Sequence, residues 1–320
     1  MRKKISIIIG IIVILFLLLL GYYKFYFIGG EIIKYNADSE KGFYNDYYVY
    51  LPHGIKESDI KYILVEPNNG GKISDNHEIH DKDALNLIRY GACHKIAQKL
   101  KVPLLVPVFD RPESNWRMYT HALDRDTLMN NEGDLARIDL QLINMITDFK
   151  EKLKDDKIIV NDKVLMSGFS ASGSFVNRFT VLHPEIIQAV ATGGINCMPI
   201  IPDAEWKDKK LIYPIGIYDI NNIADIEFNI DEYRMVSQYI YMGSLDDNDT
   251  LPYDDAYNEE ERELIIDFLG SDMHERWKKS KDIYQQLSIP AEMVMYDGIG
   301  HDVNGKIIRD IVKFFRYNAY

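Results

Sequence analysis

Residues 168–173 read Gly-Phe-Ser-Ala-Ser-Gly and lie between a β-rich run and a helical pattern. A serine in a sharp strand-to-helix turn has a strained backbone that projects its hydroxyl from the edge of a sheet. The positions two before and two after it must be small, and Gly168 and Ser172 meet that need, although glycine is usual at the second position. Ser170 is therefore a candidate nucleophile. A phosphate loop and a plain helix N-cap are the alternatives, but the lysine of a phosphate loop is missing.

A nucleophilic serine needs a base to take its proton and an acid to orient that base. In this type of turn the order along the chain is serine, acid, histidine. After an apolar run, residues 243–249 read GSLDDND, and after a second run residues 297–301 read DGIGH. We predict Asp246 as the acid and His301 as the base, with Asp247 as the alternative acid. A calcium loop would need a turn glycine and a distal glutamate that this acidic segment lacks.

These segments, together with the AVATGG run at 189–194, resemble the α/β-hydrolase superfamily. Within it, residues 45–320 are distantly similar to secreted bacterial polyhydroxybutyrate depolymerases and feruloyl-type esterases. The resemblance implies ester hydrolysis through an acyl-enzyme, without a cofactor. It also implies an oxyanion hole made by the amide of Ala171 and an amide after an early strand, for which Asn69 or Asn68 is the candidate. A serine peptidase, or a catalytically silent relative that binds the cell envelope, is the alternative.

Short β-rich runs alternate with helical patterns from about residue 30 onward, which predicts a mostly parallel central sheet with helices on both faces. We expect one hydrolase domain over residues 29–320. The predicted strands are 47–51, 61–66, 102–109, 164–166, 189–191, 238–242 and 291–296, and the predicted helices include 83–100, 134–153, 271–287 and one from 303. Segments 111–133 and 198–231 break the alternation, so they are expected to be inserted loops near the active site. Trp116, Tyr119 and His121 either line that site or simply pack the first loop.

The N-terminus predicts a membrane anchor. Residues 5–23 are 19 almost wholly apolar residues, about 28 Å of helix, which matches the hydrocarbon thickness of a bilayer. Arg2, Lys3 and Lys4 precede them, so residues 1–28 are expected to form a cytoplasmic stub and a single transmembrane helix, with the hydrolase domain outside the cell. A cleaved signal peptide is the alternative, but its apolar region would be shorter and end in small residues.

Composition excludes several classes of protein. The 37 basic and 49 acidic side chains give a net charge of −12, so nucleic acid is not an expected partner. Cys93 and Cys197 permit at most one disulfide, and two buried thiols are the favoured interpretation. Residues 77–81 (HEIHD) are expected to be a polar loop, so no metal site is predicted. The expected partners are the membrane and a small-molecule or polymeric ester.

Overall fold

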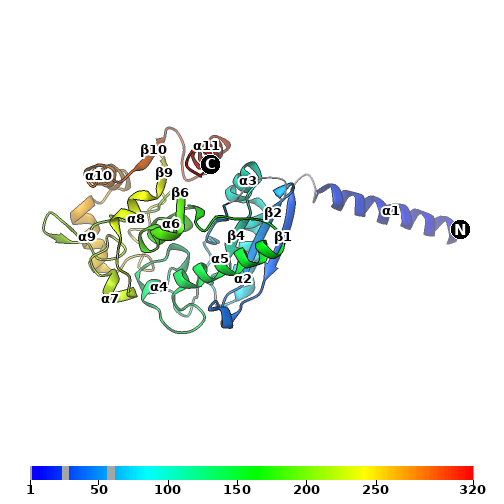
Figure 1. The fold of residues 1–320 in the computed structure, drawn as a ribbon, viewed down its shortest axis with the longest axis horizontal. Coiled ribbons are helices and arrows are strands. Elements are labelled where there is room, and N and C mark those ends of the chain that lie inside the picture. The colour runs from blue at the N-terminus through cyan, green and yellow to red at the C-terminus, as the bar shows by residue number, and fades with distance from the viewer. Residues whose placement is uncertain (1, 24–28, 56–61, 320) are drawn as a thin grey trace.

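A computed structural model describes residues 2–23, 29–55 and 62–319 (Figure 1). Its centre is an eight-stranded sheet in the order β1-β2-β4-β3-β5-β6-β9-β10. Only β2 runs against the other strands, because it is antiparallel to both β1 and β4. The strands are β1 (Gly30–Tyr35), β2 (Tyr47–Pro52), β3 (Leu64–Val65), β4 (Leu104–Pro107), β5 (Val164–Phe169), β6 (Ile187–Gly193), β9 (Ser237–Gly243) and β10 (Ala291–Tyr296). The carboxyl ends of the parallel strands share one edge, where ligands bind in open α/β sheets.

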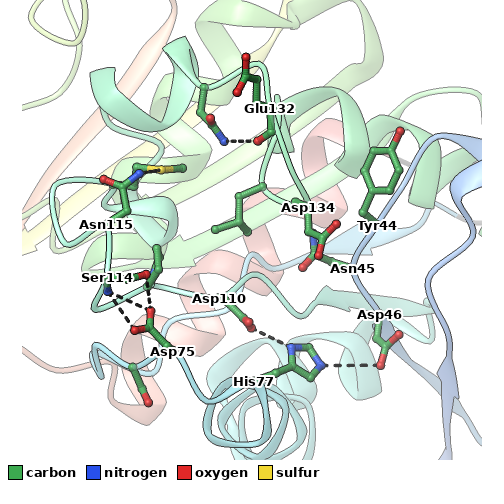
Figure 2. Close-up of a pocket in the computed structure, with 15 residues that line it drawn as sticks. Tyr44, Asn45, Asp46, Asp75, His77, Asp110, Ser114, Asn115, Glu132 and Asp134 are labelled. Carbon is green, nitrogen blue, oxygen red and sulfur yellow. Dashed lines mark hydrogen bonds and ion pairs between the residues drawn. The ribbon is translucent and has the colours of Figure 1, made fainter.

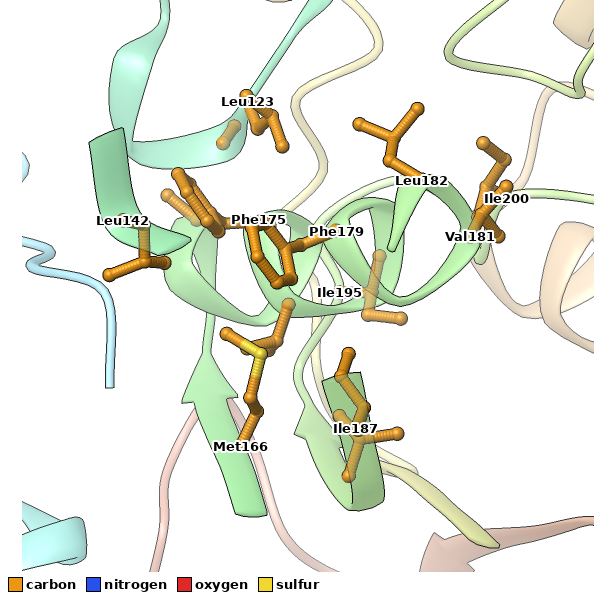
Figure 3. Packing of buried hydrophobic residues seen from close by; sticks show 14 of the residues in the cluster. Leu123, Leu142, Met166, Phe175, Phe179, Val181, Leu182, Ile187, Ile195 and Ile200 are labelled. Carbon is orange, nitrogen blue, oxygen red and sulfur yellow. The ribbon is translucent and has the colours of Figure 1, made fainter. Parts of the chain in front are cut away.

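Helices cover both faces of the sheet, and each face has its own hydrophobic cluster. The first face carries α5 (Ile138–Asp155), α6 (Ala171–Leu182), α8 (Ile230–Met235), α9 (Glu259–Leu269) and α10 (Met273–Gln286). The second face carries α2 (His77–Tyr90), α3 (Ala92–Leu100) and α11 (Gly305–Ala319). Helix α6 is buried along its whole length, and Figure 3 shows Phe175 and Phe179 packed among side chains of neighbouring elements. The rigid centre of the molecule thus holds the helix that begins directly after Ser170.

The predicted mostly parallel sheet with helices on both faces is confirmed. The helix expected over 83–100 is two helices, because the chain turns at Gly91 between α2 and α3. The prediction of a polar loop at 77–81 is wrong: these residues form the first turn of α2, which the Asn76 side chain caps. The strand expected at 61–66 is reduced to β3, and residue 61 lies outside the described residues. Strand β1 and helix α9 were not predicted.

The two segments that break the alternation are packed against the body. Segment 111–133 contains a 3-10 turn (Thr120–Ala122) and α4 (Arg125–Met129). Segment 198–231 contains the small hairpin β7 (Glu205–Trp206) and β8 (Lys209–Lys210), then α7 (Ile220–Ala224). Buried residues of the second segment extend the cluster of the first face: Ile200, Ile201, Leu211, Tyr213 and Ile215. Burial of this extent makes both segments part of the folded domain.

Helix α1 (Arg2–Tyr23) extends away from the sheet and its covering helices (Figure 1). Its large apolar side chains from Ile9 to Leu20 are between 47% and 66% exposed. Among the described residues, we find no helix with the length and apolar character that crossing a membrane requires. The predicted membrane anchor is therefore not confirmed and stays a prediction.

The two cysteines are free and buried. Cys93 belongs to the cluster on the α3 face of the sheet, whereas Cys197 belongs to the cluster on the α6 face. The sheet separates the two sulfur atoms, so they cannot form a disulfide with each other. The favoured interpretation of two buried thiols is confirmed.

Candidate active site

Ser170 occupies a strained turn between β5 and α6. Its φ of 62° and ψ of −127° lie in a region that side-chain-bearing residues rarely adopt. The turn is possible because its neighbours are small: a Cβ on Gly168 would lie 2.2 Å from the carbonyl oxygen of Ser172, and a Cβ on Gly173 would lie 2.4 Å from that of Gly193. The Ser170 amide donates to Gly193 (3.0 Å), which ties the turn to β6. The strain thus holds the hydroxyl at the sheet edge.

Ser172 replaces the glycine that is usual two residues after the nucleophile. Its hydroxyl oxygen accepts a hydrogen bond from the Phe169 amide (3.0 Å) and donates to the Phe169 carbonyl (2.9 Å). The side chain is 2% exposed and points back into the turn. Ser172 therefore fits the turn, and both hydrogen bonds of its hydroxyl are made to the Phe169 backbone within the turn.

Asp246 and His301 come from two adjacent turns at the same sheet edge. Asp246 follows β9 and His301 follows β10, and the imidazole Nδ1 lies 3.0 Å from each carboxylate oxygen of Asp246. The turns pack closely because position 243 is glycine, where a Cβ would lie 2.1 Å from the carbonyl oxygen of Ile299. Asp246 is 2% exposed, whereas the alternative acid Asp247 is exposed on the surface. The geometry selects Asp246 as the partner of the histidine.

Asn248, which the sequence analysis did not single out, joins these groups. Its Nδ2 lies 3.1 Å from His301 Nε2 and 3.4 Å from Ser170 Oγ, and its backbone amide donates to Asp246 (3.1 Å). Within the described residues, no hydrogen bond links the Ser170 hydroxyl directly to His301. The structure thus brings Ser170, Asp246 and His301 to one edge, with the Asn248 amide between the hydroxyl and the imidazole. The only sequence signal for Asn248 is its position two residues after the acid.

The two candidate asparagines of the oxyanion hole have different environments. Asn68 is 1% exposed, and its side chain is bound to the backbone of Phe109 and to the His121 ring, so it supports the loop from inside. Asn69 lines the same pocket as Ser170, and its side chain donates to Phe169 (2.8 Å). No described group accepts a hydrogen bond from the Asn69 backbone amide. Among the described residues, the Asn69 backbone amide is thus free to act as a donor.

Ala171 supplies the other expected donor. It is the first residue of α6, and the first four amides of a helix have no partner within it. The helix dipole also places partial positive charge at this end. The Ala171 amide is thus available to an anion that forms beside Ser170.

A pocket of about 350 Å³ opens beside Ser170. None of the described residues that line it is aliphatic. The lining residues are Asn69, Gly71, Arg111, Tyr119, Ser170, Asn196, Asn248, Thr250, Tyr253 and Asp255. The Arg111 guanidinium stacks on the Tyr119 ring at 3.6 Å and pairs with Asp255 at 2.5 Å. Such a lining offers many hydrogen-bonding groups, and its apolar surface comes mainly from tyrosine rings rather than aliphatic side chains. Arg111, Asn196 and Asp255 were missed by sequence reasoning.

The three candidates from segment 111–133, Trp116, Tyr119 and His121, lie in three different environments. Tyr119 lines the pocket, whereas Trp116 lines a separate surface hollow. His121 is buried, and burial lowers its pKa to about 3, so it is neutral and packs the loop. None of the described residues that line the pocket comes from 198–231.

A second pocket of about 290 Å³ also borders Asn69 and is lined in part by His301 and Glu66. Glu66 is 4% exposed, and burial raises its pKa to about 8. The neighbouring Cys93 thiol also has a raised pKa, because it is buried and because it lies near the charge of Glu66. Glu66 is thus mainly protonated at pH 7.

Figure 2 shows an acidic pocket of about 610 Å³ around His77, at the start of α2. The imidazole Nδ1 lies 2.9 Å from Asp110, and its Nε2 lies 3.9 Å from Asp46. Asp46, His77 and Asp81 each offer one possible ligand atom, and these three atoms lie within 4.8 Å of one another, as in a metal site. The Lys34 ammonium, however, lies 2.8 Å from Asp46 and 2.5 Å from Asp81. The chain itself therefore supplies the cation for these carboxylates.

Comparison with known proteins was made on sequence and on structure. No protein-family model matches the sequence, and a search of curated proteins finds no match. Solved structures do match. Poly(aspartic acid) hydrolase-1 from Sphingomonas sp. KT-1 is 15% identical over 89% of this chain and 97% of its own, with a TM-score of 0.56. The poly(3-hydroxybutyrate) depolymerase LpqC from Bordetella parapertussis is 14% identical over 90% of both chains, with a TM-score of 0.53.

A third match is FphF, a fluorophosphonate-binding serine hydrolase of Staphylococcus aureus. It is 14% identical over 91% of this chain and 99% of its own, with a TM-score of 0.51. Identities this low establish shared architecture only. The chain therefore has the α/β-hydrolase fold, which confirms the fold that the sequence resemblance implied.

Proposed function

We propose that the protein is a serine hydrolase that cleaves carboxylic esters through an acyl-enzyme. The observation that carries this proposal is the Asp246–His301 pair beside the strained Ser170 turn. A buried carboxylate 3.0 Å from Nδ1 keeps the proton on that nitrogen, so that Nε2 presents its lone pair. In the proposed reaction Nε2 removes the Ser170 proton as the hydroxyl attacks the ester carbonyl. His301 then gives this proton to the departing alcohol.

The negative charge of the tetrahedral intermediate would form between two backbone amides. Ala171 and Asn69 supply them from the start of α6 and from the loop after β3. Because backbone amides at fixed positions need no reorganisation, each such donor typically contributes about 3–4 kcal/mol to transition-state stabilisation. Water would release the acid product by the same steps in reverse order.

The lining of the pocket favours a small polar substrate. The Arg111–Asp255 pair and the surrounding amides and hydroxyls would lose hydration against a long hydrocarbon chain without gaining hydrogen bonds. We therefore propose short or hydroxylated acyl esters as substrates, rather than lipid esters. p-Nitrophenyl esters of graded chain length test this, with activity expected to fall as the chain grows beyond a few carbons. Aminoacyl anilides in the same series test the alternative of a peptidase.

The central experiment is labelling with a fluorophosphonate probe, which reacts covalently with activated serines. Wild type should be labelled and Ser170→Ala should not, whereas Ser172→Ala, which removes a hydroxyl from the same turn, should keep its label. Turnover should disappear with Ser170→Ala while the melting temperature changes little, because Ser170 Oγ supports no core. An unlabelled but well-folded wild type would instead favour a silent binding protein. A labelled Ser170→Ala would refute the nucleophile.

We further propose that the N-terminal segment anchors the hydrolase domain to the outer face of a membrane. Support comes from the exposed apolar side chains of α1 and the three basic residues that precede them. Full-length protein should stay with membranes after alkaline carbonate extraction. Leu15→Arg with Leu18→Arg should release it, since each arginine costs about 2.5–3.5 kcal/mol at mid-membrane. A mature N-terminus at or beyond about residue 21 would contradict the proposal.

A further inference from the structure

We infer that Asn248 is a catalytic residue that donates a hydrogen bond to the leaving-group oxygen of the ester. This inference rests on the proposed function and adds to it a residue with a defined step. Asn248 contacts both reacting groups, since its Nδ2 lies 3.1 Å from His301 Nε2 and 3.4 Å from Ser170 Oγ. It also lines the polar pocket in which the substrate would lie.

The orientation of the Asn248 amide follows from the tautomer of His301. Because Asp246 accepts the Nδ1 proton, Nε2 is an acceptor in the resting state. An acceptor faces the NH₂ group of an amide rather than its oxygen, which matches the 3.1 Å contact of Nδ2. The donor end of Asn248 is thus turned toward the reacting atoms by the same carboxylate that orients the base.

The position of Nδ2 coincides with the region that the leaving oxygen must occupy. That oxygen is bonded to the carbon that Ser170 Oγ attacks, and it must come within hydrogen-bond reach of His301 Nε2 to receive the proton. In the structure the Asn248 amide contacts these same two atoms. Substrate binding therefore requires the amide to move aside by about the length of one hydrogen bond.

The reaction itself supplies a new acceptor for the displaced amide. As the bond from Ser170 Oγ to the carbonyl carbon forms, Nε2 takes the serine proton and ceases to be an acceptor. The bond from carbon to the leaving oxygen then breaks, and negative charge grows on that oxygen until His301 returns the proton. The Asn248 NH₂ donates to this oxygen while the charge is present. Its own protons are not transferred.

The backbone around Asn248 is held, so only the side chain has to turn. Its amide donates to Asp246 (3.1 Å), and the next residue, Asp249, pairs with the fully buried Arg276 at 2.5 Å. Thr250 is bound to the Asn196 carbonyl through both its amide (2.6 Å) and its hydroxyl (2.7 Å). The reorganisation that substrate binding requires is therefore confined to the side-chain torsions of Asn248.

The test compares two esters whose leaving groups differ in how strongly a hydrogen-bond donor stabilises them as they depart. An alkoxide is a poor leaving group and gains much from a donor, whereas p-nitrophenolate is stable without one. With Asn248→Ala we expect kcat/KM for ethyl acetate to fall about tenfold, the effect of one hydrogen bond, and kcat/KM for p-nitrophenyl acetate to change less than about twofold. Asn248→Leu, which keeps the volume without the donor, should behave like Asn248→Ala. Asp247→Ala is the matched neighbouring control and should leave both rates unchanged.

Equal losses on the two esters would indicate a merely structural role and overturn the inference, as would no loss on either. Faster hydrolysis of both by Asn248→Ala would also overturn it, since the amide would then act as an obstacle. Fluorophosphonate labelling of each variant separates this question from the proposed function. If Ser170→Ala remains unlabelled while the Asn248 variants show no leaving-group dependence, the inference about Asn248 fails and the serine hydrolase stands.

Discussion

Replacement of Glu66 by glutamine should stabilise the protein, and the gain should grow with pH. Glu66 is 4% exposed, and one of its carboxyl oxygens, Oε2, has no hydrogen-bond partner among the described residues. Desolvation of the charged form raises its pKa from the ordinary value of 4.5 to about 8. Glutamine has nearly the same shape and carries no charge, so it keeps the packing while it removes the titration.

The sign and the size of the Glu66 effect on the free energy of unfolding follow from the difference in its pKa between the folded and unfolded states. Between about pH 4.5 and 8 the unfolded chain has released the Glu66 proton while the folded chain keeps it, so the free energy of unfolding falls as the pH rises. The slope is ~1.4 kcal/mol per pH unit, which gives a penalty of roughly 3 kcal/mol at pH 7 and roughly 4 at pH 8. Above pH 8 both states are ionised and the penalty stays constant. Below pH 4.5 both are protonated and the penalty disappears.

Urea unfolding of wild type and Glu66→Gln at pH 5 and pH 8 measures this directly. The stability difference between the two proteins should widen by about 3 kcal/mol between these pH values, because other titrating groups cancel in the comparison. Glu113→Gln, which removes an exposed carboxylate, is the matched control and should show no such widening. The same difference at both pH values would refute the argument that Glu66 is protonated in the folded protein.

Further predictions concern the acid and the nucleophile turn. Asp246→Asn should lower kcat/KM by about 10³–10⁴-fold with the fold retained, since the amide cannot keep His301 in its required tautomer, whereas Asp247→Asn should stay within about twofold. The reverse ranking in an ester assay would show that the acid is misassigned. Gly173→Ala should destabilise the protein by about 1–3 kcal/mol, because its Cβ would lie 2.4 Å from the carbonyl oxygen of Gly193. An unchanged melting temperature would contradict the close packing of α6 on β6.

The features that were predicted best from the sequence are those that depend on residues close together along the chain. The strand over 291–296 has the predicted bounds, and the Gly168–Ser172 turn lies where a strand meets a helix, because apolar periodicity and small residues are local signals. The order of serine, acid and histidine then placed three side chains at one edge, since parallel strands share their carboxyl ends. The first turn of α2 was missed, because residues 77–81 are mostly polar and carry little apolar periodicity.

The pocket could not be predicted in the same way. Arg111 and Asp255 are 144 residues apart, and nothing near either one in the sequence specifies that they pair. Asn248 lies in an acidic segment in which the sequence favoured Asp246 as the acid and left Asp247 as the alternative, but did not point to Asn248. The roles of the aspartates in this segment differ because Asp246 is buried against His301, Asp247 is exposed and Asp249 pairs with Arg276. Long-range contacts of this kind depend on how whole loops settle on the sheet.

The charges around Ser170 would let an acidic protein stabilise the oxyanion of the proposed reaction. The chain carries a net charge of −12, and an unpaired carboxylate near the site would oppose the negative charge of the intermediate. Asp246 faces His301, Asp255 pairs with Arg111, and Glu66 keeps its proton at pH 7. Each of these three carboxyls thus has an imidazole, a cation or a proton as its partner. The burial of Glu66 lowers stability, but a protonated Glu66 would add no charge beside the Asn69 amide, and the nearby Asp83 carboxylate, which packs against Gly70, is paired with Lys72.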